Sequence, residues 1–204
     1  MPTSTFFRLP EEKRQRLLDA AWEEFSRTSY SDASINQIIH NAHIPRGSFY
    51  QYFEDKKELF WYLQGEIREY FFNIFQDALW DVGGDLFKVP IRVFDRFISR
   101  QGSPDPVLAR FIQVVRLNQG MDFQHFLAEE PGLLPERFLE QVKLTGFREK
   151  NREFIDHVFF LTVAPLAYAI METLRDPEQW KRQRNMLQAR IEIIRHGSLS
   201  CEEE

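Results

Sequence analysis

The sequence has a single cysteine, Cys201, among its 204 residues. One thiol cannot form a disulfide within the chain, and a fold without disulfides suits a reducing compartment. We expect no signal peptide, and no uninterrupted apolar run reaches the roughly 18 residues that a membrane-spanning helix needs. The sequence therefore predicts a cytoplasmic protein that does not enter a membrane.

The sequence also lacks the motifs of common cofactor and metal sites. It contains no glycine-rich phosphate-binding loop, and its cysteine and histidines do not have the spacing of metal ligands. His125, His157 and His196 stand alone, and the pair Glu129-Glu130 is more simply part of a solvated surface. We therefore expect no cofactor, no metal and no catalytic residue, and an enzyme is the weaker alternative.

Positive charge is scarce as well. The formal net charge is −5, and residues 1–60 contain 8 Lys and Arg against 9 Asp and Glu. The whole molecule therefore has no positive field that would attract it to nucleic acid. Any affinity for DNA has to come from a local patch of the surface.

Helical segments separated by proline and glycine fill the chain. No segment alternates with period two for long enough to predict a strand, so the expected class is all-α. Residues 1–9 are expected to form an arm, and the last helix is expected to end at Gly197 in the C-cap position. Outside residues 34–55, we predict helices at about 10–27, 56–80, 90–100, 106–120, 123–129, 135–150, 153–174 and 177–196.

The most informative stretch is residues 34–59. Apolar residues recur at i, i+3, i+4 and i+7 from Ile35 to Ala42, and Ser34 precedes them as a side-chain N-cap. After a short break, Pro45 suits the first position of a second short helix, because its missing N–H would have no partner there. Two short helices joined by such a turn predict a helix-turn-helix, whose second helix can enter the major groove of DNA.

The side chains of the second helix fit that role. Arg46 is a forked donor for a guanine edge or a phosphate, and Gly47 lets the backbone approach a duplex. Phe49 and Phe53 lie one turn apart and should face the interior. Lys56 adds a cation where backbone N–H groups already favour a phosphate. The neutral residues that can hydrogen-bond to phosphates are Ser48, Tyr50 and Gln51.

Residues 42–53 and 55–59 resemble the recognition-helix pattern of the TetR family of transcriptional regulators, and the likeness extends back over residues 14–30. In that family glycine is usual where His43 stands, and histidine tolerates the same left-handed backbone. Pro45 replaces a residue that usually donates or accepts a hydrogen bond. The resemblance implies DNA contacts from Ser34, Pro45, Arg46, Gly47, Ser48, Tyr50, Gln51 and Lys56, of which Pro45 and Arg46 would face base edges.

The resemblance further implies two domains, a helix-turn-helix domain at 1–55 and a helical domain for effector binding and dimerisation at 56–204. The last two helices are apolar on more than one face, so one face needs a partner unless both lie in a well-buried monomer core. A homodimer would place two recognition helices about 34–36 Å apart on a palindromic operator of double-stranded DNA. The expected interface residues are Phe154, Val158, Leu161, Trp180, Leu187, Ile191 and Ile194.

The 20 phenylalanines are a heavy load for this length. Each is more simply a core residue, but the resemblance implies a small effector inside the helical bundle, and such pockets are mostly apolar. An apolar or aromatic effector is the expectation, with Arg116 or Tyr168 as its polar partner. The expected apolar lining is Phe71, Phe75, Phe94, Phe97, Phe111, Val115 and Phe159.

The hypothesis from sequence is a ligand-responsive DNA-binding transcriptional regulator, with repression as the family's usual mode. Effector binding would move the helix that begins at Lys56 and change the spacing of the two recognition helices. The alternative is a helical interaction module of the same fold that does not bind specific DNA, which the acidic charge balance and Pro45 both allow.

Overall fold

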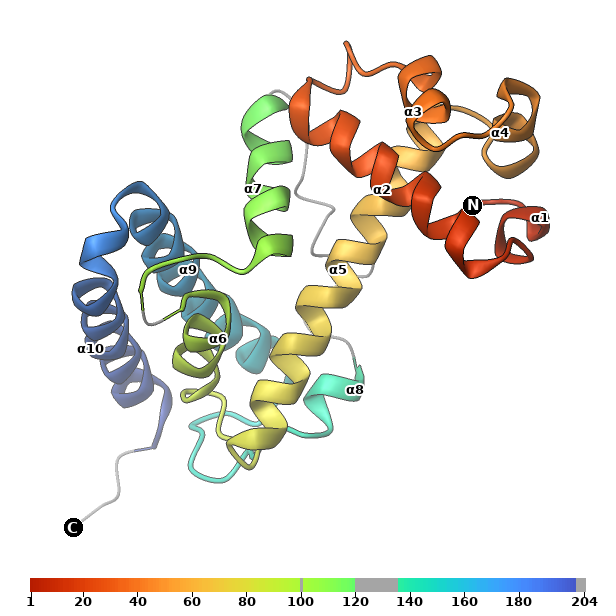
Figure 1. Cartoon of the computed structure of the whole chain (residues 1–204). Helices are drawn as coiled ribbons and strands as arrows, with labels where there is room; N and C mark the ends of the chain where they lie inside the picture. Colours follow the sequence, from red (N-terminus) through yellow and green to blue (C-terminus); the bar gives the residue numbers. More distant parts are fainter. Residues whose placement is uncertain (100, 120–135, 201–204) are drawn as a thin grey trace. The chain divides into compact units, whose positions relative to one another are not determined.

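The computed structural model describes residues 1–99, 101–119 and 136–200 (Figure 1). In these ranges all regular structure is helical and pairing is limited to single β-bridges, which agrees with the predicted all-α class. The helices are α1 (Ser4–Phe7), α2 (Glu11–Arg27), α3 (Ile35–Asn41), α4 (Arg46–Tyr52), α5 (Lys56–Asp81), α6 (Val89–Phe97), α7 (Pro106–Leu117), α8 (Glu136–Leu139), α9 (Arg152–Arg175), a 3-10 turn (Pro177–Gln179) and α10 (Trp180–Ser198).

The chain forms two compact units. Unit 1 consists of Met1–Tyr70 with the segment from Val107 that contains α7, and unit 2 consists of Phe71–Pro106 with the segment that contains α8, α9 and α10. Helix α5 therefore begins in unit 1 and ends in unit 2. The assignment of DNA binding to 1–55 and of effector binding and dimerisation to 56–204 concerns function and stays a prediction.

Helix α2 supplies much of the core of unit 1. Its apolar stripe is buried as predicted, and its carboxylate at Glu24 is also only 3% exposed. That carboxylate accepts a hydrogen bond from the backbone N–H of Ser34 at 2.9 Å and one from Arg27 at 2.6 Å. Because a buried carboxylate is costly unless it is paired, Glu24 is held in place and in turn fixes the start of α3. The buried residues of the stripe are Leu17, Leu18, Ala21 and Phe25.

The prediction of an arm over residues 1–9 is wrong. Ser4–Phe7 forms α1, which is capped by the Thr3 hydroxyl. The ring of Phe6 is fully buried and lies 4.8 Å from the ring of Phe53 and 5.2 Å from that of Tyr62, measured between centroids. Burial of one aromatic side chain contributes enough to order a short segment. The terminal position of these residues suggested disorder, but burial of their apolar side chains orders them.

Two other boundaries differ from the prediction. The helix expected over 135–150 is only α8, after which Lys143 donates its backbone N–H to Gly84 at 2.9 Å and the ring of Phe147 stacks on Phe87. Gly84 has φ +81°, and a Cβ there would lie 2.5 Å from the carbonyl oxygen of Gln141. Tertiary contacts at Gly84 thus replace helical hydrogen bonds. The helix expected at 123–129 lies outside the described residues.

The end of α10 also differs from the prediction. Gly197 is not a C-cap, because the helix continues to Ser198 and the cap is Leu199. Ser200 donates its backbone N–H to Gly146 at 2.9 Å, and Arg148 donates to Ser198 at 3.1 Å. These bonds stabilise the helix end, so a left-handed glycine is not needed.

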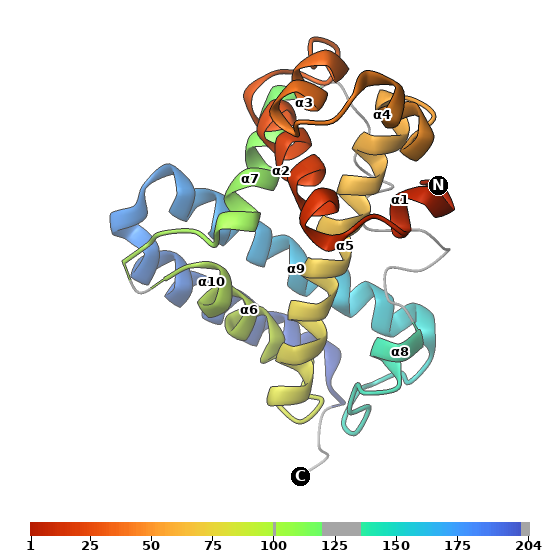
Figure 2. The ribbon, with the colours of Figure 1, turned by 45° about the vertical axis from the view of Figure 1, so that its right-hand side comes forward.

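In unit 2, α9 and α10 lie side by side and α6 packs against both (Figures 1 and 2). Helix α9 is long and apolar enough to span a membrane by length and composition, although the sequence has no uninterrupted apolar run of about 18 residues. Core helices of soluble proteins pass the same test. A third of its most apolar window is buried within the structure, and Pro165 lies within the helix.

Candidate nucleic-acid interface

The turn between α3 and α4 has the predicted construction. The Ser34 side chain accepts a hydrogen bond from the backbone N–H of Gln37 at 3.4 Å, which caps α3. His43 has φ 54°, the left-handed conformation that the resemblance requires at that position. Ile44, which is buried, then donates to the carbonyl of Ile39 at 3.0 Å. The turn is closed by backbone bonds and one apolar anchor.

Helix α4 presents one face to the interior and the other to solvent. Phe49 and Tyr52, with Phe53 directly after the helix, are at most 4% exposed. Pro45 stands at the N-cap, one position before the predicted one, so it still sets the entry of the chain without losing a helical bond. Ser48 is half-buried. The predicted DNA-contacting residues on the outer surface are Pro45, Arg46, Gly47, Tyr50 and Gln51.

Gly47 is a glycine in the recognition helix that no internal contact of the protein requires. Its backbone is not left-handed, and a Cβ built on it meets no atom within 4 Å. Glycine inside a helix costs roughly 0.5–1 kcal/mol relative to alanine. A residue that lowers the stability of the recognition helix without an internal reason favours close approach by another molecule.

Lys56 has a second role that the sequence did not reveal. Its ammonium donates to the carbonyl oxygens of Ser31 at 3.1 Å and Ala33 at 2.8 Å, and it lies 4.9 Å from the centre of the Tyr30 ring. Burial first, and then the carboxylate of Asp55, raise the pKa of the Tyr30 hydroxyl, so this ring stays neutral. An ammonium has three N–H donors, so one remains for the predicted phosphate contact.

The sequence missed the residues that support α4 from behind. Thr3 donates its hydroxyl to the carbonyl of Gln51 at 2.5 Å and its backbone N–H to that of Tyr52 at 3.0 Å. Phe6 packs against Phe53. The available signal was the adjacent pair Phe6-Phe7, since two aromatic residues are more than a disordered arm requires.

The residues predicted to line an effector pocket are divided between the two units. Phe111, Val115 and Arg116 lie in unit 1, and the remaining six lie in unit 2. Within unit 2 the rings of Phe71 and Phe97 pack edge to face at 5.4 Å, as do those of Phe75 and Phe159 at 5.8 Å. Phe94 is fully buried, whereas Tyr168 is half exposed under the guanidinium of Arg190. Five of these six residues thus pack in or near the core and Tyr168 lies at the surface. The predicted pocket stays a prediction.

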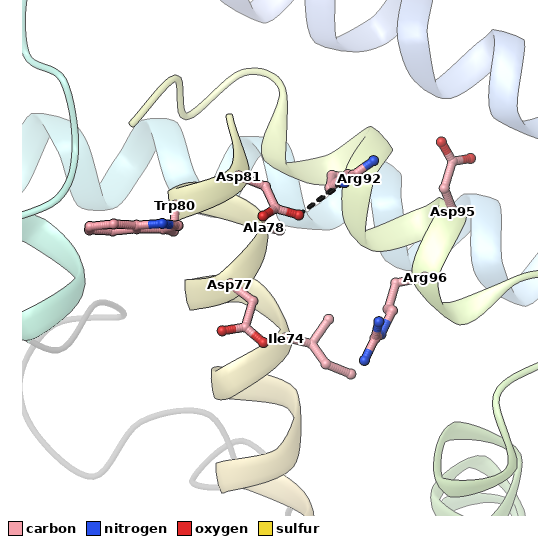
Figure 3. A pocket seen from close by; sticks show the side chains of 8 residues that line it. All are labelled: Ile74, Asp77, Ala78, Trp80, Asp81, Arg92, Asp95 and Arg96. Atoms are coloured by element: carbon pink, nitrogen blue, oxygen red, sulfur yellow. Dashed lines mark hydrogen bonds and ion pairs between the residues drawn. The ribbon is translucent and has the colours of Figure 1, made fainter. Parts of the chain in front are cut away.

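A hollow of about 440 Å³ lies instead between α5 and α6 (Figure 3). Its walls are charged, with Asp77 from α5 and Arg96 from α6 on either side of Ile74. Arg92 pairs with Asp81 across it at 3.0 Å. This lining is polar and open to solvent, unlike the aromatic pocket that the sequence suggested.

The predicted dimer residues divide into two groups. Val158, Leu187 and Ile191 are at most 3% exposed within their own chain, so they cannot form an outer face, and this part of the prediction is wrong. They belong to the core of their own chain. Phe154, Trp180 and Ile194 are half-buried, and Leu161 is 51% exposed. The exposed face of α9 also contains Phe160, Tyr168 and Met171.

Comparisons with known proteins point to the same segment. The family model of bacterial regulatory proteins of the tetR family matches residues 17–63. The chain is 45% identical over 49 residues to the HTH-type transcriptional regulator SrpR of Pseudomonas putida, covering 24% of this chain and 23% of that protein. It is 27% identical over 86 residues to the HTH-type transcriptional repressor DhaR of a Mycobacterium species, covering 42% and 41% of the two chains. This chain therefore spans well under two thirds of the length of either relative.

A solved structure extends the likeness over the whole chain. The TetR-like transcriptional regulator from Rhodococcus sp. RHA1 superposes with a TM-score of 0.59 at 19% identity, covering 94% of this chain and all of that one. At that identity the likeness concerns the fold, while the domain match concerns the helix-turn-helix itself. Residues 17–63 therefore form a helix-turn-helix of the TetR family of bacterial regulatory proteins, and the fold of the chain is similar to that of a solved TetR-like regulator.

Proposed function

We propose that this protein is a cytoplasmic transcriptional regulator that binds double-stranded DNA through the outer face of α4. The observation that carries the proposal is the sidedness of this helix. Phe49 and Tyr52 are buried, and Arg46, Tyr50 and Gln51 are exposed on the helix that follows the left-handed turn at His43. A forked guanidinium at the N-terminus of such a helix can read a guanine edge, while the neutral donors hold phosphates.

Two copies of the chain would bind a palindromic operator. The support is the apolar face of α9, where Leu161, Ala164, Tyr168 and Met171 recur at helical spacing and all are exposed. A soluble protein rarely exposes such a continuous apolar stripe unless it pairs with another surface. A two-fold dimer through this stripe and the adjacent surface of α10 would tie two recognition helices together.

Control by a small apolar or aromatic effector completes the proposal, and repression is the proposed outcome. The aromatic content of unit 2 supports a ligand of this chemistry. A coupling of about 1–3 kcal/mol between the two sites would weaken operator binding roughly 5–150-fold. We propose no catalytic role.

The test is a binding titration with DNA that flanks the protein's own gene. Arg46→Ala and Tyr50→Ala should each weaken specific binding by about 1–3 kcal/mol, because each removes a base or phosphate contact. Lys150→Ala, which removes one exposed positive charge from unit 2, should leave the affinity unchanged. Binding of wild-type protein should weaken with salt at a slope of about −0.9 per phosphate contacted.

The alternative of a helical interaction module predicts a different result. Wild-type protein would then show no preference for its flanking DNA over unrelated DNA at physiological salt. Equal binding by Arg46→Ala and wild-type protein would also refute the role of α4.

A further inference from the structure

Helix α4 is too short to hold its own conformation. It has seven residues, and isolated helices of that length are not stable in water because nucleation is costly. In its last turn the carbonyl of Phe49 accepts the N–H of Phe53 at 2.9 Å, whereas the carbonyls of Gln51 and Tyr52 are bonded from outside the helix. The orientation of its outer face is therefore set by whatever contacts its two ends. The turn at His43 holds the first end.

The last turn of α4 is held by the N-terminal segment, residues 3–7. Thr3 supplies two donors to consecutive carbonyls, with its hydroxyl on Gln51 at 2.5 Å and its backbone N–H on Tyr52 at 3.0 Å. The same hydroxyl accepts the N–H of Phe6 at 3.4 Å, so it caps α1 while it binds α4. Few side chains can do both, because a hydroxyl combines one donor with acceptor lone pairs.

The aromatic side of this contact fixes the segment to the domain. Phe6 is fully buried between Phe53, which directly follows α4, and Tyr62 of α5. Burial first, and then the neighbouring Glu66 carboxylate, raise the pKa of Tyr62 to about 12, so this phenol stays neutral. Residues 3–7 thus join the end of α4 to the beginning of α5 through uncharged groups, while the N-terminal ammonium of Met1 adds an ion pair with Glu58 of α5 at 2.6 Å.

From this arrangement we infer that Thr3 and Phe6 are positioning residues for DNA recognition, which act on α4 without contacting the duplex. The inference rests on the proposed function. It assigns the first seven residues a role that neither the family match over residues 17–63 nor the helix-turn-helix itself includes. We call the contacts of Thr3 and Phe6 with the end of α4 the clamp. Loss of the clamp would let the outer face of α4 tilt, which would lower specific DNA binding more than the general attraction to phosphates.

The experiment compares Thr3→Val with Thr3→Ser in the full-length protein, and uses Thr5→Val as the matched control. Thr5 is exposed on the same short helix, so the control repeats the chemical change without the clamp. Thr3→Val should weaken specific operator binding roughly 2- to 10-fold, the range expected for one hydrogen bond. Thr3→Ser should restore it, and Thr5→Val should bind as wild type. Phe6→Ala should have the larger effect.

Two readouts separate positioning from direct contact or general instability. The salt slope of Thr3→Val should equal that of wild type, because the number of phosphate contacts is unchanged. Non-specific binding should be unaffected, so the ratio of specific to non-specific affinity should fall. A slope reduced by about one unit would overturn the inference in favour of a direct phosphate contact. Wild-type affinity in Thr3→Val, or equal losses in Thr3→Val and Thr5→Val, would also overturn it.

Hydrogen exchange in the absence of DNA keeps this test separate from that of the proposed function. Amides of α4 in Thr3→Val should exchange faster than those of wild type, while amides in the core of α2 exchange equally in both. If wild-type protein binds no DNA, the proposed function fails. Unchanged exchange in α4 would then show that the clamp does not exist.

Discussion

The two units of the molecule expose opposite kinds of side chain at the surfaces proposed to bind partners. In unit 1, α4 buries its aromatic residues and exposes Arg46 and Gln51. In unit 2, α9 exposes Phe160, Leu161, Tyr168 and Met171, each at 42% to 56% of its full area. A charged and hydrogen-bonding face suits a phosphate backbone, whereas an apolar stripe suits another protein surface.

This difference explains why the DNA-contacting surface is easier to predict from the sequence than the dimer surface. A DNA-contacting helix has to meet a duplex of fixed shape, so a few residue types at fixed spacing carry the information. A dimer face only has to match itself under two-fold symmetry, and many apolar combinations can do so. Accordingly, the family match covers residues 17–63 and does not reach α9.

The largest effect is expected from placing a charge on the apolar stripe. Leu161→Glu should convert the dimer to a monomer, because two carboxylates would face each other across the two-fold axis without partners. Losing the second recognition helix should weaken operator binding by roughly 100-fold or more. Sedimentation and an operator titration measure the two quantities. Asn73→Glu adds the same charge at an exposed position of α5 and should change neither. A dimeric Leu161→Glu protein would remove the stripe from the proposed interface.

A smaller effect is expected at the polar surface of α4, where one substitution should raise the stability of the protein and weaken its DNA binding. Gly47→Ala should raise the free energy of unfolding by about 0.5–1 kcal/mol, since alanine favours the helix and the added methyl meets nothing. The same methyl should obstruct close approach to DNA and weaken binding roughly tenfold, equivalent to about 1.4 kcal/mol.

Gly65→Ala is the matched control for this change, because Gly65 lies in α5 and also has open space around its Cβ position. It should stabilise the protein to a similar extent and leave DNA binding unchanged. Thermal unfolding and the operator titration give both quantities. Unchanged DNA affinity in Gly47→Ala would mean that the backbone of α4 does not approach the duplex.

A further effect, on stability alone, concerns two of the buried amides, Gln64 in unit 1 and Gln183 in unit 2. Among the described residues, Gln64 in unit 1 has no hydrogen-bond partner for either side-chain polar atom, whereas Gln183 in unit 2 lacks one only for its oxygen. An unpaired buried polar group costs about 1–3 kcal/mol. Gln64→Leu should therefore raise the free energy of unfolding by about that amount in urea denaturation, and Gln183→Leu should raise it less. A lower stability of Gln64→Leu would show that this amide has a partner in solution.

The sequence predicted those parts of the fold that local rules decide. Ser34 caps α3, Asp176 caps the turn before α10, and α5 ends where two left-handed glycines begin at Gly83. His43 adopts the left-handed backbone. Each depends only on residues a few positions away, which are visible in the sequence.

Long-range contacts decided the rest. The periodicity of residues 135–150 suggested a helix, but the hydrogen bond from Lys143 to Gly84 cannot be predicted from periodicity. Leu187 was assigned to an outer face because both faces of α10 are apolar, and only packing against α9 shows which one is inside. For the candidate site, the exposed residues of α4 were predictable from spacing, whereas Thr3 is 48 positions from Gln51 and could not be.

The ammonium of Lys56 makes the first turn of α5 and the loop before α3 move together. It donates hydrogen bonds to the carbonyl oxygens of Ser31 and Ala33. A displacement of α5 would therefore be transmitted to the helix-turn-helix through these charged hydrogen bonds as well as through apolar packing. Arginine at this position would keep the charge but not the compact geometry of two bonds to one nitrogen. Under the proposed effector control, Lys56→Arg should weaken the coupling between the effector site and the helix-turn-helix, while the charge count and every exposed residue of α4 stay the same.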